Sequence, residues 1–354
     1  MPLMHRQSLV QFAAPICETV VDAPVPQGGE VLLRVTKCGL CHSDLHLQDG
    51  FFDAGGGQRI DITRGIKLPF TLGHEIVGTV EATGPDAPSD LIGQQRVVFP
   101  WIGCGTCRDC VNGDENLCAR NRYLGVALDG GFASHVLIPD SRYLLPYDPL
   151  PEGFAAALMC SGLTAYGALK RAAAHPRRRN LLLIGMGGVG LMGLSIARAM
   201  DIDNIAIADV SDTARDTAID AGAAIAYDPA ARETARRMLK DSGGGFDVIV
   251  DFAGSEASLA FAMGALARGG KIVVSGLIGG AFNIPAVNWV HKRMSVEGFM
   301  TGTLDEAREL LDLARTGRIS PAPMHEAPMR EAALWMDRLR QGHVTGRVIL
   351  SNEA

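Results

Sequence analysis

The stretch Leu181-Leu-Leu-Ile-Gly-Met-Gly-Gly-Val-Gly190 decides the fold of this chain. Four apolar residues lead into three glycines with the spacing G-x-G-x-x-G, at Gly185, Gly187 and Gly190. An apolar strand that runs into this pattern at the start of a helix is typical of the phosphate-binding turn of a doubly wound α/β sheet. The pattern alone is weak in a chain with 42 glycines, so its position between strand and helix carries the prediction.

Each position of this turn has a physical role. Gly185 permits a tight turn, Gly187 lets the backbone approach a pyrophosphate, and Gly190 lets the helix pack closely on the strand. The helix begins near Gly188 and Val189, where free N–H groups and the helix dipole favour phosphate. The sequence therefore predicts a dinucleotide site here.

An acidic residue ends the next predicted strand, Ile205–Asp209. A carboxylate at Asp209 accepts hydrogen bonds from the adenosine ribose hydroxyls and repels a 2′-phosphate. No arginine follows at once, since the nearest downstream is Arg215. We therefore predict NAD rather than NADP; the alternative is that Asp209 only caps the next helix.

The chain around this turn alternates between strand and helix from about Pro151 onwards. Apolar strands with helices between them indicate a parallel, doubly wound sheet. Strands are expected at 180–184, 205–209, 246–252 and 270–277, and helices at 188–200, 213–221 and 255–266.

The preceding half is different in character, because short β-branched runs alternate with Gly/Pro/Asp turns. These runs, at 31–35, 76–80 and 95–99, predict a barrel-like or sandwich-like module. Two helices, at 305–316 and 329–341, and a strand at 347–350 are expected to end the chain, and that strand could return to the first module.

Composition excludes several classes of function. With 354 residues and 47% hydrophobic content, the chain suits about two domains. The formal charge is 33 − 39 = −6, which argues against nucleic acid as a partner. The N-terminus lacks the features of a signal peptide, and the charge-free stretch 180–197 is better interpreted as a buried strand and helix than as a membrane span. We expect a cytoplasmic protein without a membrane partner.

Four of the eight cysteines lie close together with the spacing C-x2-C-x2-C-x7-C, at Cys104, Cys107, Cys110 and Cys118. Four thiolates on one short lobe match a closed, tetrahedral zinc site that leaves no position for substrate, so its role is structural. A zinc module for nucleic acid is the competing interpretation, and the acidic balance of the chain weighs against it.

Three further potential ligands, Cys41, His74 and Cys160, are scattered along the chain. Two thiolates and one imidazole leave one zinc position open, as in catalytic sites. Spacing alone does not join these residues. A lone histidine is more often structural, and a lone cysteine is more often a small buried hydrophobe.

In combination, these motifs resemble those of the zinc-containing medium-chain alcohol dehydrogenases. Cys38-Gly-Leu-Cys-His-Ser-Asp-Leu-His46, Gly73-His-Glu75, the cysteine lobe and the glycine turn occur in that family's order over essentially the whole chain. The resemblance implies an α/β protein with a GroES-like catalytic domain at 1–160 and 298–354 and a zinc lobe at about 103–119. A Rossmann coenzyme domain would occupy 161–297.

The resemblance also implies roles for single residues. Cys41, His74 and Cys160 match the ligands of the catalytic zinc, with Glu75 as the carboxylate that transiently replaces water on that metal. Asp44 matches the acid that orients the ligand histidine. The remaining matches are Ser43 and His46 for the proton relay, His42 and Arg347 near the coenzyme phosphates, and Thr164 against the nicotinamide.

The family chemistry is transfer of a hydride between an alcohol carbon and NAD, with two zinc ions per subunit acting as one catalytic and one structural ion. A small-molecule alcohol or aldehyde is the expected substrate, and a homodimer or homotetramer is the expected assembly. A zinc-independent enone reductase on the same scaffold would need neither the scattered ligands nor the Ser43–His46 relay. A non-enzymatic zinc-lobe protein would leave the dinucleotide turn without a purpose.

The long Gly-rich segment 47–72 and the stretch Phe99-Pro-Trp-Ile-Gly-Cys104 resemble bacterial 6-hydroxyhexanoate dehydrogenases within the family. By this similarity Trp101 lines the alcohol pocket and favours primary alcohols. Arg59, Arg64 or Lys67 would meet the far carboxylate of an ω-hydroxy acid. The alternatives are a broad-range primary alcohol dehydrogenase or aldehyde reductase, with these cations lying on a solvated loop.

Overall fold

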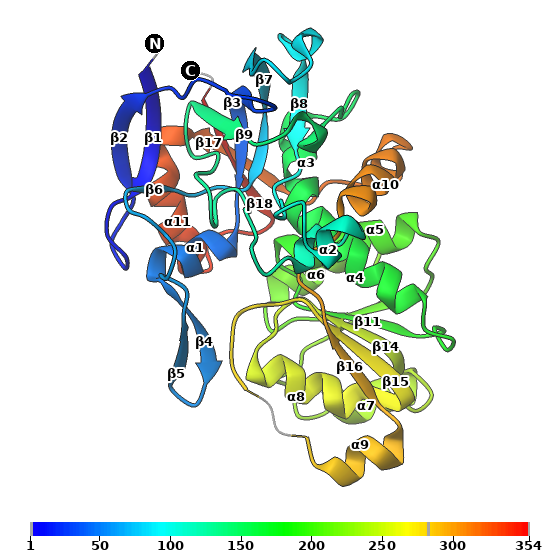
Figure 1. Cartoon of the computed structure of the whole chain (residues 1–354). Helices are drawn as coiled ribbons and strands as arrows, with labels where there is room; N and C mark the ends of the chain where they lie inside the picture. Colours follow the sequence, from blue (N-terminus) through cyan, green and yellow to red (C-terminus); the bar gives the residue numbers. More distant parts are fainter. Residues whose placement is uncertain (1–2, 282–283, 353–354) are drawn as a thin grey trace.

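The computed structural model describes residues 3–281 and 284–352. A β-rich part, which contains both ends of the chain, lies above an α/β part in Figure 1. No helix in the described ranges has the length and apolar character needed to cross a membrane.

The α/β part is built on a parallel sheet of six strands in the order β13-β12-β11-β14-β15-β16. Its strands are β11 (Leu181–Ile184), β12 (Ile205–Ala208), β13 (Ile225–Tyr227), β14 (Phe246–Asp251), β15 (Leu266–Val274) and β16 (Ser295–Gly298). Strands β11, β12 and β14 are buried throughout, which explains their continuous apolar sequences. The predicted fold class is confirmed.

Helices connect these strands and cover the sheet. They are α4 (Leu163–Ala173), α5 (Gly188–Ala199), α6 (Asp212–Asp220), α7 (Thr234–Asp241), α8 (Glu256–Ala265) and α9 (Ala286–Lys292). One large apolar core joins the α4–α5 face of the sheet to the β-rich part, and a second core lies on the α8 face.

The β-rich part contains a seven-stranded sheet in the order β10-β8-β7-β3-β18-β17, with β9 also paired to β3. Its strands are β3 (Val31–Leu40), β7 (Glu75–Thr83), β8 (Gln95–Val98), β9 (His135–Ile138), β10 (Leu144–Leu145), β17 (Met324–Pro328) and β18 (Arg347–Ser351). A second sheet joins β1 (Leu3–Leu9), β2 (Cys17–Asp22) and β6 (Phe70–Thr71). Because β18 pairs antiparallel with β3, the last strand does return to the first module.

Short helices complete this part. They are α1 (His42–Asp49), α2 (Arg108–Val111), α3 (Glu152–Ala157), α10 (Leu304–Arg315), α11 (Ala332–Arg340) and the 3-10 turns η1 (Ser89–Leu91), η2 (Glu115–Leu117), η3 (Ser141–Tyr143) and η5 (Met329–Glu331). A π-helical turn, η4 (Leu158–Gly162), makes α3 and α4 one continuous helical run between the two parts.

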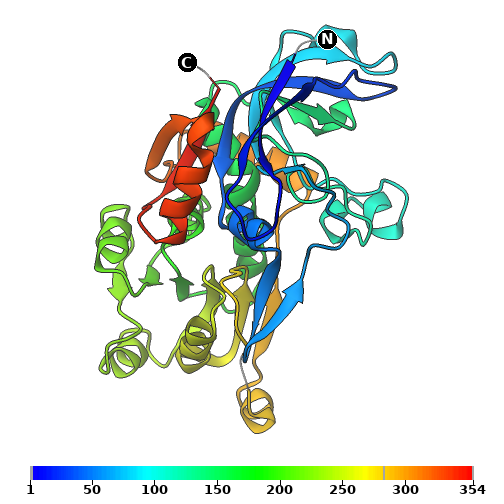
Figure 2. The ribbon, with the colours of Figure 1, turned by 90° about the vertical axis from the view of Figure 1, so that its left-hand side faces the viewer.

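The segment 47–72 is not only a loop, because it forms a hairpin of β4 (Phe51–Gly55) and β5 (Gln58–Asp61). Figures 1 and 2 show this hairpin extending from α1 towards the α/β part. Its strands were not predicted from the sequence, because glycines break their periodicity and β5 is exposed throughout. Likewise β13, α7, α9 and β16 were missed, since these short elements bury little apolar surface.

Candidate active site and metal centres

Three separate elements bring the scattered ligand residues together. Cys41 lies between β3 and α1, His74 directly precedes β7, and Cys160 lies in the π-helical turn η4. Their potential ligand atoms, with one from Glu75, all lie within 4.8 Å of one another, and all four residues are buried. The Sγ atoms of Cys41 and Cys160 are 3.8 Å apart.

The donor set fits zinc. Two thiolates at a Zn–S distance of about 2.3 Å in tetrahedral geometry lie about 3.8 Å apart, which matches the sulfur pair here. Nε2 of His74 and Oε2 of Glu75 are buried and have no hydrogen-bond partner among the described residues. Such atoms are costly to bury unless a ligand satisfies them.

Asp44 holds this cluster in place from α1. One of its carboxylate oxygens accepts hydrogen bonds from the Cys41 N–H at 2.8 Å, and the other accepts one from the Gly73 N–H at 3.2 Å. The second oxygen also lies 3.5 Å from Nδ1 of His74. Burial opposes a charged His74, but the Asp44 carboxylate raises the pKa of His74 well above its ordinary value.

The contact between the two thiols moves their pKa values in opposite directions. The hydrogen bond from Cys160 lowers the pKa of Cys41 well below its ordinary value, whereas the same contact and burial raise the pKa of Cys160. A divalent cation among these donors favours the deprotonated form of both thiols.

Glu75 and Arg347 form a buried ion pair between β7 and β18. Burial raises the pKa of Glu75 to about 7, against the opposing effect of the Arg347 charge. Arg347 also runs beside the start of α5, since a Cβ atom at Gly188 would lie 2.6 Å from its Cδ. One guanidinium thus lies between the cysteine–histidine cluster and the glycine turn.

The glycine turn has the geometry that its sequence predicts. Gly185 adopts a φ of 86°, and a Cβ atom at Gly190 would lie 1.9 Å from the carbonyl oxygen of Gly185. Gly187 precedes α5, and no atom lies within 4 Å of where its Cβ would be. The turn therefore leaves room for a ligand above Gly187.

Asp209 lies at the end of β12 and bonds to the same turn. Its Oδ2 accepts a hydrogen bond from Met186 N at 2.6 Å, and its Oδ1 accepts one from Ser211 N at 2.8 Å. Arg215 donates to the Asp209 main-chain oxygen at 2.6 Å. The residue that caps the N-terminus of α6 is Ser211 and not Asp209. The Ser211 side chain accepts a hydrogen bond from Ala214 N.

Helices α1 and α4 carry the other predicted site residues. Ser43 Oγ lies 3.7 Å from Cys41 Sγ, and His42 is the first residue of α1. The ring of His46 contacts that of Phe52 in β4 at 4.8 Å. Thr164 Oγ1 donates to Met300 O at 3.2 Å.

Trp101 lies beside the cluster, with its ring 5.4 Å from that of His74. Its Nε1–H donates to Met159 O at 2.8 Å, next to Cys160. Tyr123 packs edge-on against Trp101 at 5.4 Å. Sequence reasoning missed Phe52 and Tyr123, because aromatic residues in loops and edge strands carry no motif.

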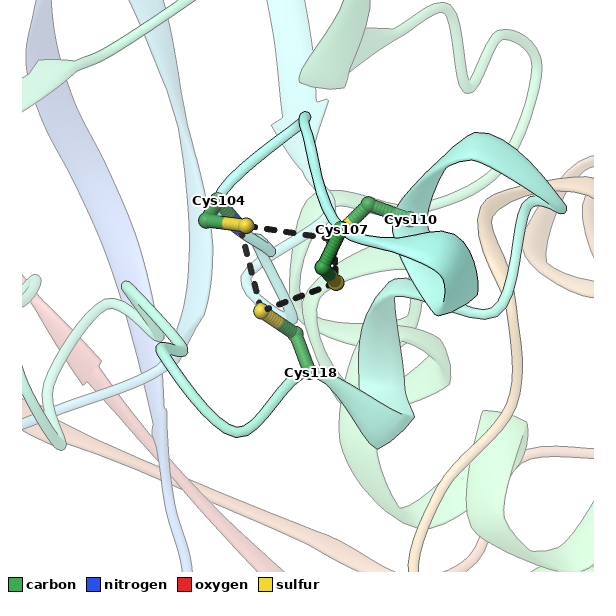
Figure 3. A group of neighbouring side chains, drawn as sticks. All are labelled: Cys104, Cys107, Cys110 and Cys118. Carbon is green, nitrogen blue, oxygen red and sulfur yellow. Dashed lines mark hydrogen bonds between the residues drawn. The ribbon is translucent and has the colours of Figure 1, made fainter.

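The four cysteines of the lobe converge in Figure 3. Their Sγ separations are 3.4 Å for Cys107–Cys110, 3.8 Å for Cys107–Cys118 and 4.0 Å for Cys104–Cys110. These values bracket the spacing of about 3.8 Å expected for four thiolates around zinc. Because the protein supplies all four donors, the lobe fits a closed structural site.

Two family models match the chain. The alcohol dehydrogenase GroES-like domain matches residues 27–149, and the zinc-binding dehydrogenase domain matches residues 188–316. Together with the glycine turn and the two donor sets, they define a zinc-dependent nucleotide-binding oxidoreductase.

Full-length relatives are consistent with this class. The chain is 34% identical to an NAD-dependent alcohol dehydrogenase of Saccharolobus solfataricus over 98% of its length and 99% of that protein. It is 32% identical to one of Sulfurisphaera tokodaii, over the same shares of the two chains. An alcohol dehydrogenase structure from Aeropyrum pernix superposes with a TM-score of 0.86 at 28% identity, covering 98% of this chain and 99% of that one.

The chain belongs to the zinc-type medium-chain alcohol dehydrogenase family. It is an NAD-dependent alcohol dehydrogenase with NAD and zinc as its cofactors.

Proposed function

We propose that this alcohol dehydrogenase acts on primary alcohols and prefers ω-hydroxy acids of the 6-hydroxyhexanoate class. The observation that carries this proposal is the placement of Arg59. Its guanidinium lies 3.9 Å from the centre of the Phe51 ring, in the same strand as Phe52, which contacts His46. The hairpin thus carries a cation on Phe51, the residue next to Phe52 in β4.

Among the three cations of this segment, Arg59 is the best candidate for a carboxylate partner. Arg64 points into solvent, with 92% of its side chain exposed, and lies 3.9 Å from Asp61. Lys67 is exposed beyond the hairpin. A guanidinium held on an aromatic face loses less side-chain entropy when it binds a carboxylate.

The test compares kcat/KM for 6-hydroxyhexanoate, hexan-1-ol and benzyl alcohol with NAD. We expect an advantage of at least about tenfold for the hydroxy acid, equal to about 1.4 kcal/mol. Arg59→Ala should remove this advantage without changing the values for hexan-1-ol. Arg64→Ala is the matched control and should change kcat/KM for neither the hydroxy acid nor hexan-1-ol.

A broad-range primary alcohol dehydrogenase is the second candidate. Trp101 favours it, because a buried ring beside His74 narrows the pocket for any alcohol, whatever its far end carries. Equal values of kcat/KM for hexan-1-ol and 6-hydroxyhexanoate would favour this candidate. The cations of the hairpin would then be solvent-exposed charges without a role in substrate binding.

For the catalytic zinc we propose Cys41, His74 and Cys160 as ligands, with Glu75 as an occasional fourth donor. When bound, zinc supplies a Lewis acid for the substrate oxygen and NAD supplies the hydride acceptor. Asp44 orients His74 through Nδ1, which fixes the ring relative to the two sulfurs. Trp101, whose ring lies beside that of His74, would exclude water from that side of the substrate.

For the proton we propose a route from the substrate hydroxyl to Ser43, and from there through the nicotinamide ribose to His46. Burial and the nearby His42 lower the pKa of His46, so its ring is neutral and able to accept a proton near pH 7. His42 and Arg347 would contact the coenzyme phosphates. The turn from Gly185 to Gly190 would hold the pyrophosphate, including the N–H groups of Gly188 and Val189.

For the rest of the coenzyme we propose Asp209 at the adenosine ribose and Thr164 against the nicotinamide. Cys104, Cys107, Cys110 and Cys118 would hold the structural zinc. We also propose the domain limits 1–160 with 298–354 and 161–297. The strand pairing supports the limit near residue 298. β16, which ends at Gly298, is the edge strand of the six-stranded sheet, whereas β17 and β18 belong to the seven-stranded sheet.

We propose a homodimer or homotetramer that assembles through the coenzyme domains. Two features support this assembly: β16 is an edge strand, and the preceding helix α9 exposes Val287, Trp289 and Val290. Light scattering after size exclusion should give a dimer or tetramer mass, and Val290→Lys should shift it towards the monomer. A monomeric wild-type protein would contradict the proposal.

A further inference from the structure

A short main-chain segment, Met300 and Thr301, lies just beyond the carboxyl edge of the six-stranded sheet. β16 ends at Gly298, and Phe299 N donates to Val274 O of β15 at 2.8 Å. Open α/β sheets bind ligands outside the carboxyl ends of their strands, and each half of a dinucleotide occupies one half of the sheet. The segment follows β16, in the half of the sheet opposite to β12 and Asp209. It therefore lies beside the place proposed for the nicotinamide.

Two side chains from outside the sheet hold this segment. Thr164 of α4 donates to Met300 O at 3.2 Å. Asn116 of η2, within the cysteine lobe, donates through Nδ2 to Thr301 O at 2.6 Å. The Asn116 contact joins residues 185 positions apart and is buried, since Asn116 is 8% and Thr301 is 1% exposed.

The lobe gives Asn116 a fixed position. The residue lies between Cys110 and Cys118, and its main-chain oxygen accepts a hydrogen bond from the Tyr123 hydroxyl at 2.7 Å. The adjacent Glu115 is also buried and accepts from Gly103 N at 2.8 Å. Because these contacts fix Asn116 within the lobe, the position of the lobe determines the position of the main chain that the Asn116 side chain contacts.

The surroundings of the bond from Asn116 Nδ2 are buried. Oδ1 of Asn116 and Oγ1 of Thr301 are buried and have no hydrogen-bond partner among the described residues. Loss of the Nδ2 donor would therefore leave the Thr301 carbonyl without this partner in a place that water does not reach. The segment would shift to find another donor.

We propose that Asn116 is a positioning residue through which the structural zinc lobe sets the main chain facing the nicotinamide half of the coenzyme. The lobe then contributes to coenzyme affinity as well as to stability. This inference rests on the coenzyme placement given under the proposed function. Asn116 acts through Thr301 and Met300, and it need not touch the coenzyme itself.

The experiment compares Asn116→Ala and the isosteric Asn116→Asp with Asn112→Ala, an exposed asparagine at the end of α2 in the same lobe. For each purified holoenzyme, zinc content is measured, NADH binding is followed by fluorescence, and ADP-ribose binding is followed by calorimetry. ADP-ribose lacks the nicotinamide and reports on the adenosine half alone.

We expect both Asn116 variants to keep two zinc ions, to bind NADH at least about fivefold more weakly, and to bind ADP-ribose within twofold of wild type. Asn112→Ala should match wild type in zinc content, NADH affinity and ADP-ribose affinity. A proportional loss of affinity for both ligands, or NADH affinity equal to the control, would overturn the proposal. Loss of zinc from both variants would also overturn it, because Asn116 would then belong to the folding of the lobe.

Failure of the coenzyme placement gives a different result. If wild-type protein bound NADH but not ADP-ribose, the adenosine half would not lie at the glycine turn, and the proposed site would be wrong. The inference about Asn116 would then fail with it, irrespective of the variants.

Discussion

At the scale of single residues, we expect Asp209 to set the choice between NAD and NADP. Its carboxylate lies at the end of β12, where it would repel a 2′-phosphate, while Arg215 lies close enough to bond its main chain. Asp209→Asn removes the charge but keeps one oxygen acceptor for the turn. We expect the ratio of kcat/KM for NADP to that for NAD to rise about tenfold, equal to about 1.4 kcal/mol.

Steady-state kinetics with both coenzymes measures this ratio. The double variant Asp209→Asn, Arg215→Ala is the control, and it should lose most of the gain because Arg215 is the nearby cation. An unchanged ratio in Asp209→Asn would show that Asp209 does not select the coenzyme.

We expect His46 to set the pH dependence of alcohol oxidation. Burial and the charge of His42 lower the pKa of His46 below its ordinary value of 6.5. The neutral ring accepts the proton, so kcat/KM should stay level near neutral pH and fall only as the pH drops through that lowered pKa. His46→Phe keeps the ring contact with Phe52 but cannot carry a proton.

The pH profile of His46→Phe is therefore the test. We expect kcat/KM at pH 7 to fall by about 10²-fold, the lower end of general acid–base contributions, and the acid limb to disappear. An acid limb with the same midpoint in the variant would assign the titration to another group.

At the scale of elements, the β4–β5 hairpin docks on the loop after β15. Asp53 O accepts a hydrogen bond from Gly280 N at 3.3 Å, and a Cβ atom at Gly55 would lie 2.4 Å from Ala281 N. Gly57 is a matched control, because its φ of 77° is close to the 80° of Gly55 while nothing lies within 4 Å of its Cβ position.

Gly55→Ala and Gly57→Ala should thus share a backbone cost of about 1–2 kcal/mol. Only Gly55→Ala should also undock the hairpin. Hydrogen exchange by mass spectrometry should show faster exchange around Gly280 in Gly55→Ala and wild-type exchange there in Gly57→Ala. Equal protection of that peptide in both variants would mean that the contact is incidental.

At the scale of the whole molecule, Arg347 ties the C-terminal strand to both functional centres. It pairs with Glu75 in β7 and passes beside Gly188 at the start of α5. Removing one partner of a buried ion pair leaves an uncompensated charge, whereas removing both is often nearly neutral. Arg347→Gln should lower the free energy of unfolding by about 3–5 kcal/mol, and Glu75→Gln in addition should restore most of it.

Denaturant unfolding without coenzyme measures these free energies. The control is Lys37→Gln, because Lys37 pairs with Glu326 at 2.7 Å across the same sheet but Glu326 is exposed. That change should cost no more than about 1 kcal/mol. Additive losses from the Arg347 and Glu75 substitutions would show that the two residues are energetically independent.

The sequence by itself determined the class of fold and the chemistry of the donors. The alternation around Leu181–Gly190 predicted the parallel sheet, because apolar strands and helix periods are local properties of the chain. The spacing of Cys104, Cys107, Cys110 and Cys118 predicted a closed site for the same reason: one short lobe supplies every donor. Resemblance to a family, and not spacing, joined Cys41, His74 and Cys160.

Only the tertiary structure brought those three residues within 4.8 Å, because β3, β7 and η4 meet through long-range pairing and packing that no local pattern encodes. The same is true of the Arg347–Glu75 pair, the hairpin docked on Gly280 and the bond from Asn116 to Thr301. Each joins groups that are far apart in sequence. Their contact is fixed by burial and sheet register, which depend on the whole chain.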